Sequence, residues 1–167
     1  ITGDEKYYKE AVRQLLNYKD ILFMDNEKLY SHIYYPETND RNNIPWGRGN
    51  GWVFFTLEDA LEHIPQHIEG YNAIKENFKA FAQGLKKVQS ESGMWRQVLN
   101  LSDTYLETSG TCIFAIGMLK AVNAKILGSE YGEIAKKAVL DTLKRMIDEQ
   151  GNVNGVCRGS QCSRESI

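Results

Sequence analysis

Residues 46–52 bring together the densest set of chemically useful side chains in the sequence, in the order Trp-Gly-Arg-Gly-Asn-Gly-Trp. Arg48 carries a planar guanidinium that can hold a carboxylate through two parallel hydrogen bonds. Trp46 and Trp52 carry flat faces that can stack on a ring, and Asn50 adds an amide. Three glycines in five residues allow sharp backbone bends and the close approach of a ligand. The segment therefore predicts a binding site for an anionic, ring-shaped molecule.

The place of this segment in the chain supports the same interpretation. An apolar helix is expected over residues 51–64, with Pro65 as its stop. The segment would then stand at a helix N-terminus, where free N–H groups and the helix dipole favour negative charge. It lacks the Gly-Lys-Ser or Gly-Lys-Thr ending of a phosphate-binding loop. The structural alternative is a glycine-rich turn whose tryptophans belong to the core.

A second polar segment stands at the start of the next apolar helix, which is expected over residues 106–126 with Gly128 as its stop. This segment contributes Glu107, Thr108 and Ser109. If both apolar helices point the same end at one cavity, the two segments line the same pocket. The alternative is a capping arrangement, in which Thr104 or Ser102 is the N-cap and Glu107 satisfies backbone donors.

Histidine and cysteine residues give fewer indications of a functional site. His32 lies in an extended run shortly before the Trp-Gly-Arg segment, where an imidazole could bond a sugar hydroxyl or have a structural role. The odd number of cysteines, Cys112, Cys157 and Cys162, argues against a disulfide framework. Cys157 and Cys162 are five residues apart with no histidine nearby, so no metal site is expected.

The elements that must position these side chains repeat along the chain. Three stretches have an apolar stripe at helical spacing: residues 4–18, 70–89 and 130–148. A turn and an extended piece follow each of them: residues 29–34, 95–99 and 153–157. The repeated unit is an apolar helix, an amphipathic helix and a short strand, which is typical of stacked αα-hairpins.

Long loops and short strands after each amphipathic helix favour a closed barrel of inner and outer helices over an open superhelix. The expected fold class is all-α, a partial barrel of about two and a half αα-hairpins formed by residues 1–167 as a single domain. Six hairpins would need roughly 360 residues at this period. A central-to-C-terminal fragment of such a barrel is therefore expected, and a free-standing domain of five helices is the alternative.

Composition excludes several classes of function. The chain is 42% hydrophobic and 25% charged, as is ordinary for a soluble globular protein. The formal net charge of -2 gives no electrostatic basis for binding nucleic acid or an anionic membrane. No apolar run approaches the roughly 18–20 residues that span a bilayer.

Five motifs in order give the sequence a specific resemblance. They are Thr2–Tyr7, Trp46–Trp52, Gly93–Leu99, Tyr105–Ser109 and Gly155–Gly159. Together they resemble glycoside hydrolase family 105, the unsaturated rhamnogalacturonyl hydrolases, and the related family 88 of unsaturated glucuronyl hydrolases. The likeness runs over nearly the whole chain.

This resemblance implies that the barrel is an (α/α)6 barrel, of which this chain forms a part. It also implies a bacterial enzyme, cytoplasmic or periplasmic, that hydrates the C4=C5 double bond of Δ4,5-unsaturated uronic acids. The expected partner is an oligosaccharide, of rhamnogalacturonan or related type, that carries such a uronic acid at its non-reducing end. One Asp would act as general acid and base, and no metal or organic cofactor is implied. The resemblance places this Asp upstream of the chain, so the chain alone is expected to be inactive.

Carried over residue by residue, the resemblance assigns Arg48 to the uronate carboxylate, and Trp46 and Trp52 to the substrate pocket. His32 is similar to a pocket histidine, although the family pattern His-Gly-Trp-Asp reads His-Ile-Tyr-Tyr here. Two alternatives stay open: a sugar epimerase on a similar barrel, or a helical-repeat or carbohydrate-binding module. Association through the truncated barrel faces is a further expectation.

Overall fold

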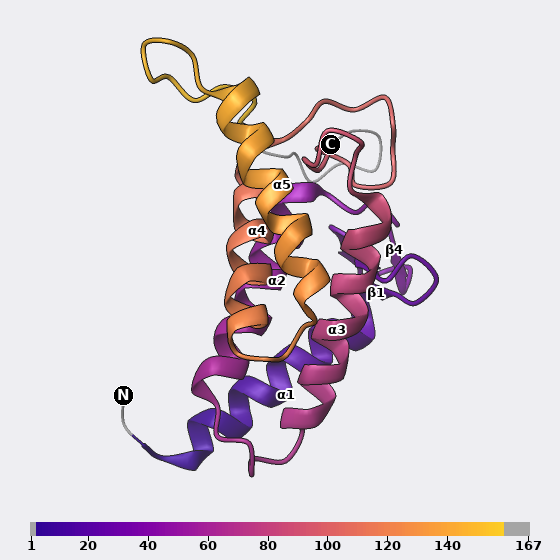
Figure 1. Ribbon diagram of the computed structural model, residues 1–167. Coiled ribbons are helices and arrows are strands. Elements are labelled where there is room, and N and C mark those ends of the chain that lie inside the picture. Colours follow the sequence, from indigo (N-terminus) through magenta and orange to yellow (C-terminus); the bar gives the residue numbers. More distant parts are fainter. Residues whose placement is uncertain (1–2, 159–167) are drawn as a thin grey trace.

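Five helices form where the sequence carries apolar faces at helical spacing (Figure 1). The computed structural model describes residues 3–158, so Thr2, Gly159 and Cys162 lie outside the described part of the chain. The helices are α1 (Glu5–Leu22), α2 (Gly47–His63), α3 (Tyr71–Val88), α4 (Thr108–Asn123) and α5 (Ser129–Met146). The expected order of amphipathic and apolar helices is confirmed.

Strands are shorter than the sequence predicts. Two antiparallel pairs form, β1 (Phe23–Met24) with β2 (Leu29–Tyr30), and β3 (Tyr34–Tyr35) with β4 (Asp40–Arg41). The strands expected over residues 95–99 and 153–157 make only isolated bridges, among them the bridge between Trp46 and Val98. These segments contact helix ends and loops instead of a neighbouring strand, which limits their pairing.

Helices α2 and α4 lie side by side and run in the same direction (Figure 1). Their N-terminal ends meet at Gly47 and Gly110. Near their C-terminal ends, the ammonium group of Lys120 lies 2.7 Å from a carboxylate oxygen of Glu58 and 2.7 Å from one of Glu62. Helix α5 packs against α4, and α3 packs against α2 and α1. This is the inner and outer helix arrangement that the repeat predicts.

The close approach of α2 and α4 depends on glycine. A methyl group at Gly47 would lie 2.5 Å from the carbonyl oxygen of Arg96, and one at Gly110 would lie 3.1 Å from the carbonyl of Gly47. At Gly117 the obstacle would be the ring of Phe54, 2.8 Å away. Helix α2 starts at Gly47, so the expectation of a glycine-rich turn before residue 51 is wrong. These glycines are needed for their small size, because their φ angles are not positive.

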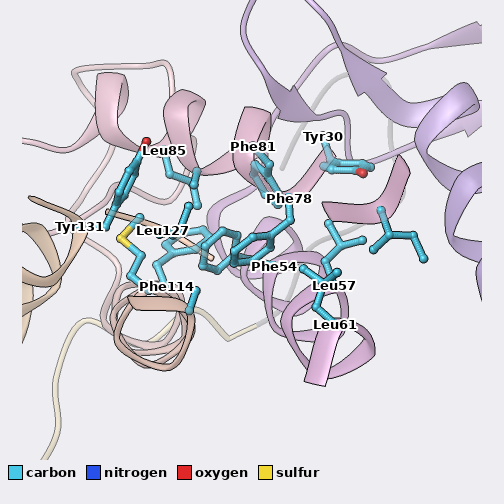
Figure 2. Close-up of a cluster of buried hydrophobic side chains, with 14 of the residues drawn as sticks. Tyr30, Phe54, Leu57, Leu61, Phe78, Phe81, Leu85, Phe114, Leu127 and Tyr131 are labelled. Carbon is cyan, nitrogen blue, oxygen red and sulfur yellow. The ribbon is translucent and has the colours of Figure 1, made fainter. Parts of the chain in front are cut away.

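The core is centred on an aromatic cluster between α2, α3 and α4 (Figure 2). Phe54 stacks on Phe78 with ring centroids 4.5 Å apart, and its edge meets Phe81 at 5.4 Å and Phe114 at 6.0 Å. All four rings are completely buried. Trp95 joins the cluster through Phe114, and its indole N–H donates to the carbonyl oxygen of Leu85 at 2.8 Å.

Several expected details are wrong. Helix α4 ends at Asn123, and Gly128 is the N-cap of α5 and not the stop of α4. The apolar stripe of residues 4–18 was expected to include Ala11, which is exposed. The stripe of residues 130–148 was expected to include Leu143 and Ile147, but Leu143 is 55% exposed and Ile147, the C-cap of α5, is 38% exposed. The buried positions of α5 lie on the side that faces α4, and the other side has no comparable contact within residues 3–158.

None of the helices between residues 3 and 158 combines the length and the apolar composition that a bilayer crossing requires.

Replacing Phe54 with alanine is expected to lower the free energy of unfolding by about 3–5 kcal/mol, because it empties the centre of the aromatic cluster. The adjacent Phe55 is 38% exposed and provides a matched control. Its replacement with alanine is expected to cost less than about 1.5 kcal/mol. Urea titrations followed by circular dichroism measure both values, and equal losses would contradict the assignment of Phe54 to the core.

Replacing Gly47 with alanine is expected to cost at least about 2 kcal/mol, because the new methyl group would meet main-chain atoms that cannot rotate away. Gly51 lies one turn later, where a methyl group would lie at ordinary contact distance, 3.4 Å from Ile113. Gly51→Ala is therefore expected to stay within about 1 kcal/mol of the unmodified chain. The same urea titration compares the two, and a Gly47→Ala chain as stable as the Gly51→Ala chain would refute the close approach of Gly47 to the main chain of Arg96 and Gln97.

Candidate functional site

Arg48 lies in the first turn of α2, where its guanidinium is partly buried. Its Nη1 donates to the carbonyl oxygen of Cys157 at 2.5 Å, across 109 residues of sequence. The guanidinium carbon also lies 5.2 Å from the ring centroid of Trp46, in a cation–π contact. The guanidinium is thus held by a main-chain acceptor and by an aromatic ring.

Trp46 and His32 complete this side of the site. The imidazole meets the indole edge to face, with ring centroids 4.6 Å apart. The main-chain N–H of His32 donates to the carbonyl oxygen of Ile44 at 2.9 Å, which places the ring beside α2. Burial lowers the pKa of His32 below its ordinary value of 6.5, so the imidazole is neutral at pH 7. Three of the predicted residues, His32, Trp46 and Arg48, are therefore brought together.

Asn50 is placed differently from the other predicted ligands. Its side chain is 2% exposed, and its amide accepts from the N–H of Tyr30 at 2.9 Å. The same amide donates to the carbonyl oxygens of Tyr30 and Trp46 at 2.8 and 3.0 Å. Both amide hydrogens are thus used within the protein, and Asn50 braces β2 against the start of α2. A direct contact between Asn50 and a ligand stays a prediction. The hydrogen bonds within the protein disfavour it, because they already occupy the amide group.

Trp52 points away from the cluster of His32, Trp46 and Arg48. It is 57% exposed and meets the ring of Phe55 at 6.3 Å. It lines a mostly apolar groove of about 290 Å³ between α1 and α2, together with Tyr18 and neighbouring side chains. Within residues 3–158, Trp52 therefore belongs to a surface separate from the one around Arg48.

Glu107 is the N-cap of α4 and is 1% exposed. Its carboxylate accepts from the N–H groups of Ser109 and Gly110 at 3.1 and 2.6 Å, and from the hydroxyl of Ser109 at 2.6 Å. A fourth donor is the N–H of Cys157 at 2.9 Å. The idea that Thr104 or Ser102 would be the N-cap is therefore wrong. The other part of the capping alternative is correct, because Glu107 does satisfy backbone donors.

Thr108 binds the same C-terminal segment. Its N–H donates to the carbonyl oxygen of Gly155 at 2.9 Å, and its hydroxyl donates to that of Asn154 at 2.6 Å. Together with the contacts of Cys157, these bonds attach residues 154–157 along the starts of α2 and α4. Of the three polar residues predicted to line a pocket, Glu107 and Thr108 thus hold the backbone of residues 154–157, and Ser109 bonds the Glu107 carboxylate.

Sequence reasoning missed Tyr105 and Cys157. Tyr105 is 46% exposed, and partial burial together with the neighbouring thiol of Cys157 raises the pKa of its hydroxyl to about 12. Arg48 acts in the opposite direction on that pKa, so this phenol also lies near the guanidinium. Cys157 contributes mainly backbone atoms, which the identity of a residue does not reveal. Tyr105 stands in a conspicuous motif and was detectable as an exposed aromatic beside it.

Residues 3–158 bring together one group with metal-ligand chemistry, Asp59, Glu62 and His63. All three are exposed and lie in the last turns of α2, whereas Arg48 lies in its first turn. The surface around Arg48 instead offers a fixed cation, an indole, a neutral imidazole and a phenol. Such a set can bind a carboxylate attached to a polar ring.

Comparison with known proteins gives consistent results. The model of Glycosyl Hydrolase Family 88 matches residues 1–166. An unsaturated rhamnogalacturonyl hydrolase of Bacillus subtilis is 29% identical over 157 residues, which cover 93% of this chain and 44% of that protein. An unsaturated 3S-rhamnoglycuronyl hydrolase of an Alteromonas species is 28% identical over 161 residues, with 93% and 39% covered.

A solved structure agrees with the sequence relatives. The crystal structure of a possible member of the GH105 family from Salmonella enterica superposes with a TM-score of 0.87 and 29% identity. The match covers 96% of this chain and 43% of the Salmonella chain. This chain therefore spans less than half the length of these relatives. The resemblance seen in the ordered motifs is confirmed, and so is the partial α/α-barrel: the chain belongs to glycosyl hydrolase family 88.

Proposed function

We propose that this chain forms part of the site of an enzyme that hydrates Δ4,5-unsaturated uronic acids at the non-reducing end of oligosaccharides. Rhamnogalacturonan-type fragments are the preferred substrate class, because relatives that match most of the chain are hydrolases of unsaturated rhamnogalacturonyl and rhamnoglycuronyl substrates. The observation that supports this proposal most strongly is the Arg48 guanidinium, held in place at the start of α2.

Arg48 has spare capacity for an anion. A guanidinium has five N–H donors, and one of them is used for the carbonyl oxygen of Cys157. Among the ion pairs found between residues 3 and 158, none includes Arg48. A substrate carboxylate would therefore bring the first negative partner to this cation. A uronic acid supplies that carboxylate on a ring that can also contact Trp46.

The proposed reaction begins at the double bond next to that carboxylate. An acid adds a proton to C4, and water adds to C5 and loses its own proton to the resulting base. The hemiketal so formed opens and releases the rest of the oligosaccharide. In this scheme Arg48 orients the carboxylate on C5. Neutral His32 and the hydroxyl of Tyr105 lie on the same surface and can contact sugar hydroxyls.

The proton donor is proposed to come from another part of the whole protein. Glu107 is the carboxylate that the described contacts connect to Arg48 through Cys157. It is buried, and both of its carboxylate oxygens already accept hydrogen bonds, four in total, from groups of the protein itself, so we do not assign the proton transfer to it. The family resemblance provides the acid as an Asp that precedes the first residues of this chain.

Replacing Arg48 with alanine is expected to weaken binding of an unsaturated uronyl disaccharide at least about tenfold, because a charge-assisted hydrogen bond is lost. Isothermal titration calorimetry measures this change. Arg13 on α1 is exposed and pairs with Glu10, so Arg13→Ala is the matched control and should bind as the unmodified chain does. Equal affinity of the Arg48→Ala chain would refute the role of Arg48.

Incubation of the isolated chain with the same disaccharide tests the location of the proton donor. We expect the ultraviolet absorbance of the conjugated double bond to persist, although the disaccharide binds. Steady loss of this absorbance would show that residues within the chain supply the acid, and would contradict the proposed division of roles. A saturated disaccharide without the double bond serves as the optical control.

The partial burial of His32 predicts that the stability of the folded chain depends on pH. Because burial lowers its pKa, the unfolded chain takes up a proton near the ordinary value of 6.5, before the folded chain does. The free energy of unfolding should therefore decrease as the pH falls from 6.5 towards the lowered pKa. His32→Gln should remove this part of the slope. Urea midpoints at several pH values measure it, and identical slopes for both chains would contradict the buried, neutral imidazole.

A further inference from the structure

We propose that Glu107 is a positioning residue for Arg48, acting through the backbone of Cys157. Cys157 donates its N–H to the Glu107 carboxylate at 2.9 Å and accepts from Arg48 with its carbonyl oxygen at 2.5 Å. One residue thus links the N-cap of α4 to the guanidinium on α2. The inference rests on the proposed function in one respect, namely that Arg48 binds the substrate carboxylate.

The contact between Glu107 and Cys157 goes beyond helix capping. An N-cap side chain needs to accept only from the first free N–H groups of its helix, and Glu107 does so at Ser109 and Gly110. A cap with one methylene fewer, such as Asp, would serve this purpose equally well. The additional length of Glu allows its Oε1 atom to reach Cys157 as well. The longer side chain therefore has a use that the stability of α4 does not explain.

The segment that Glu107 holds is also attached by contacts that do not involve Glu107. Thr108 bonds the carbonyl oxygens of Asn154 and Gly155, the N–H of Asn154 donates to the carbonyl oxygen of Met146 at 2.7 Å, and the side chain of Cys157 contacts the Tyr105 hydroxyl. Among these residues, Glu107 bonds the N–H of Cys157. Loss of the Glu107 contact would leave the Thr108 contacts in place. The effect would then be confined to the end of the segment that carries the acceptor for Arg48.

Arg48 needs such an acceptor in order to be ready for a ligand. An arginine side chain is rich in rotamers, and immobilising it during binding lowers affinity. Trp46 restricts one face of the guanidinium, but a ring contact does not fix rotation within the plane of the guanidinium. The carbonyl oxygen of Cys157 does fix this rotation, and Glu107 fixes the carbonyl by holding the residue that bears it.

Glu107→Asp separates the two roles of Glu107, because Asp keeps the charge and the cap but is too short for Cys157. We expect the Arg48 guanidinium to rotate faster in this variant, as measured by nitrogen-15 nuclear magnetic resonance of arginine side chains. The signals of Arg48 are identified by their loss in Arg48→Lys. The buried indole N–H of Trp95 reports whether the fold is retained.

Affinity for the unsaturated uronyl disaccharide should fall about 2- to 12-fold in Glu107→Asp, the range for immobilising one flexible side chain. Asp4 provides the control, because its carboxylate caps α1 by accepting from the N–H of Lys6 at 3.0 Å. Asp4→Ala should change neither the rotation of Arg48 nor the affinity. Unchanged rotation of Arg48 in a folded Glu107→Asp chain would overturn the proposal.

The reciprocal experiment does not depend on changing Glu107. If the two contacts of Cys157 are coupled, removing the donor of Arg48 must weaken the bond to Glu107. Arg48→Met should therefore speed hydrogen exchange at the N–H of Cys157, while exchange at the N–H of Thr108 stays the same. Unchanged exchange at Cys157 would overturn the proposal even if Glu107→Asp fails to fold.

The proposed function and this inference can fail separately. If the unmodified chain does not bind the disaccharide, the assignment of Arg48 to a uronate carboxylate is wrong, while the rotation of the guanidinium still decides the role of Glu107. If the unmodified chain binds and Glu107→Asp leaves both rotation and affinity unchanged, the positioning role is wrong and the proposed function stands.

Discussion

The contact between the backbones of α2 and α4 is the constraint on which the arrangement of the site depends. Gly110 lets the first turn of α4 lie against the main chain of Gly47, and Gly47 in turn lies against the main chain of Arg96 and Gln97. Because both helices start at this point, the guanidinium of Arg48 and the carboxylate of Glu107 reach the same short segment from two sides. If the helices were further apart, this segment could contact only one of them instead of both.

Charges are handled in opposite ways at the two ends of this helix pair. At the N-terminal ends, the negative charge of Glu107 is surrounded by four neutral or backbone donors, and no cation pairs with it directly among the described ion pairs. At the C-terminal ends, Lys120 bridges Glu58 and Glu62. The first arrangement leaves the positive charge of Arg48 available, because Glu107 bonds the N–H of Cys157 and does not pair with the guanidinium.

Much of the fold was predictable, since apolar stripes at helical spacing are set by burial and persist over many residues. The amphipathic helices over residues 4–18, 70–89 and 130–148 all form. The start of α2 was misplaced because a glycine-rich stretch resembles a turn locally, and the need for small residues arises from segments that are distant in sequence, namely residues 96–97 and α4. The link through Cys157 was not predictable, because backbone atoms carry it and any residue has them. The candidate site was recognisable from Arg48 and Trp46, whereas Trp52 shares their motif but lines another groove.

The glycines of the helix pair also determine how the sequence can drift over evolutionary time. A side chain at Gly47 would meet the main-chain oxygens of Arg96 and Gln97, and no substitution elsewhere can shrink a main chain. A side chain at Gly117 would meet the ring of Phe54, which a smaller residue could replace. Descendants can therefore change positions 54 and 117 as a compensating pair, whereas position 47 has no such partner and must stay glycine for as long as the start of α2 lies against residues 96–97.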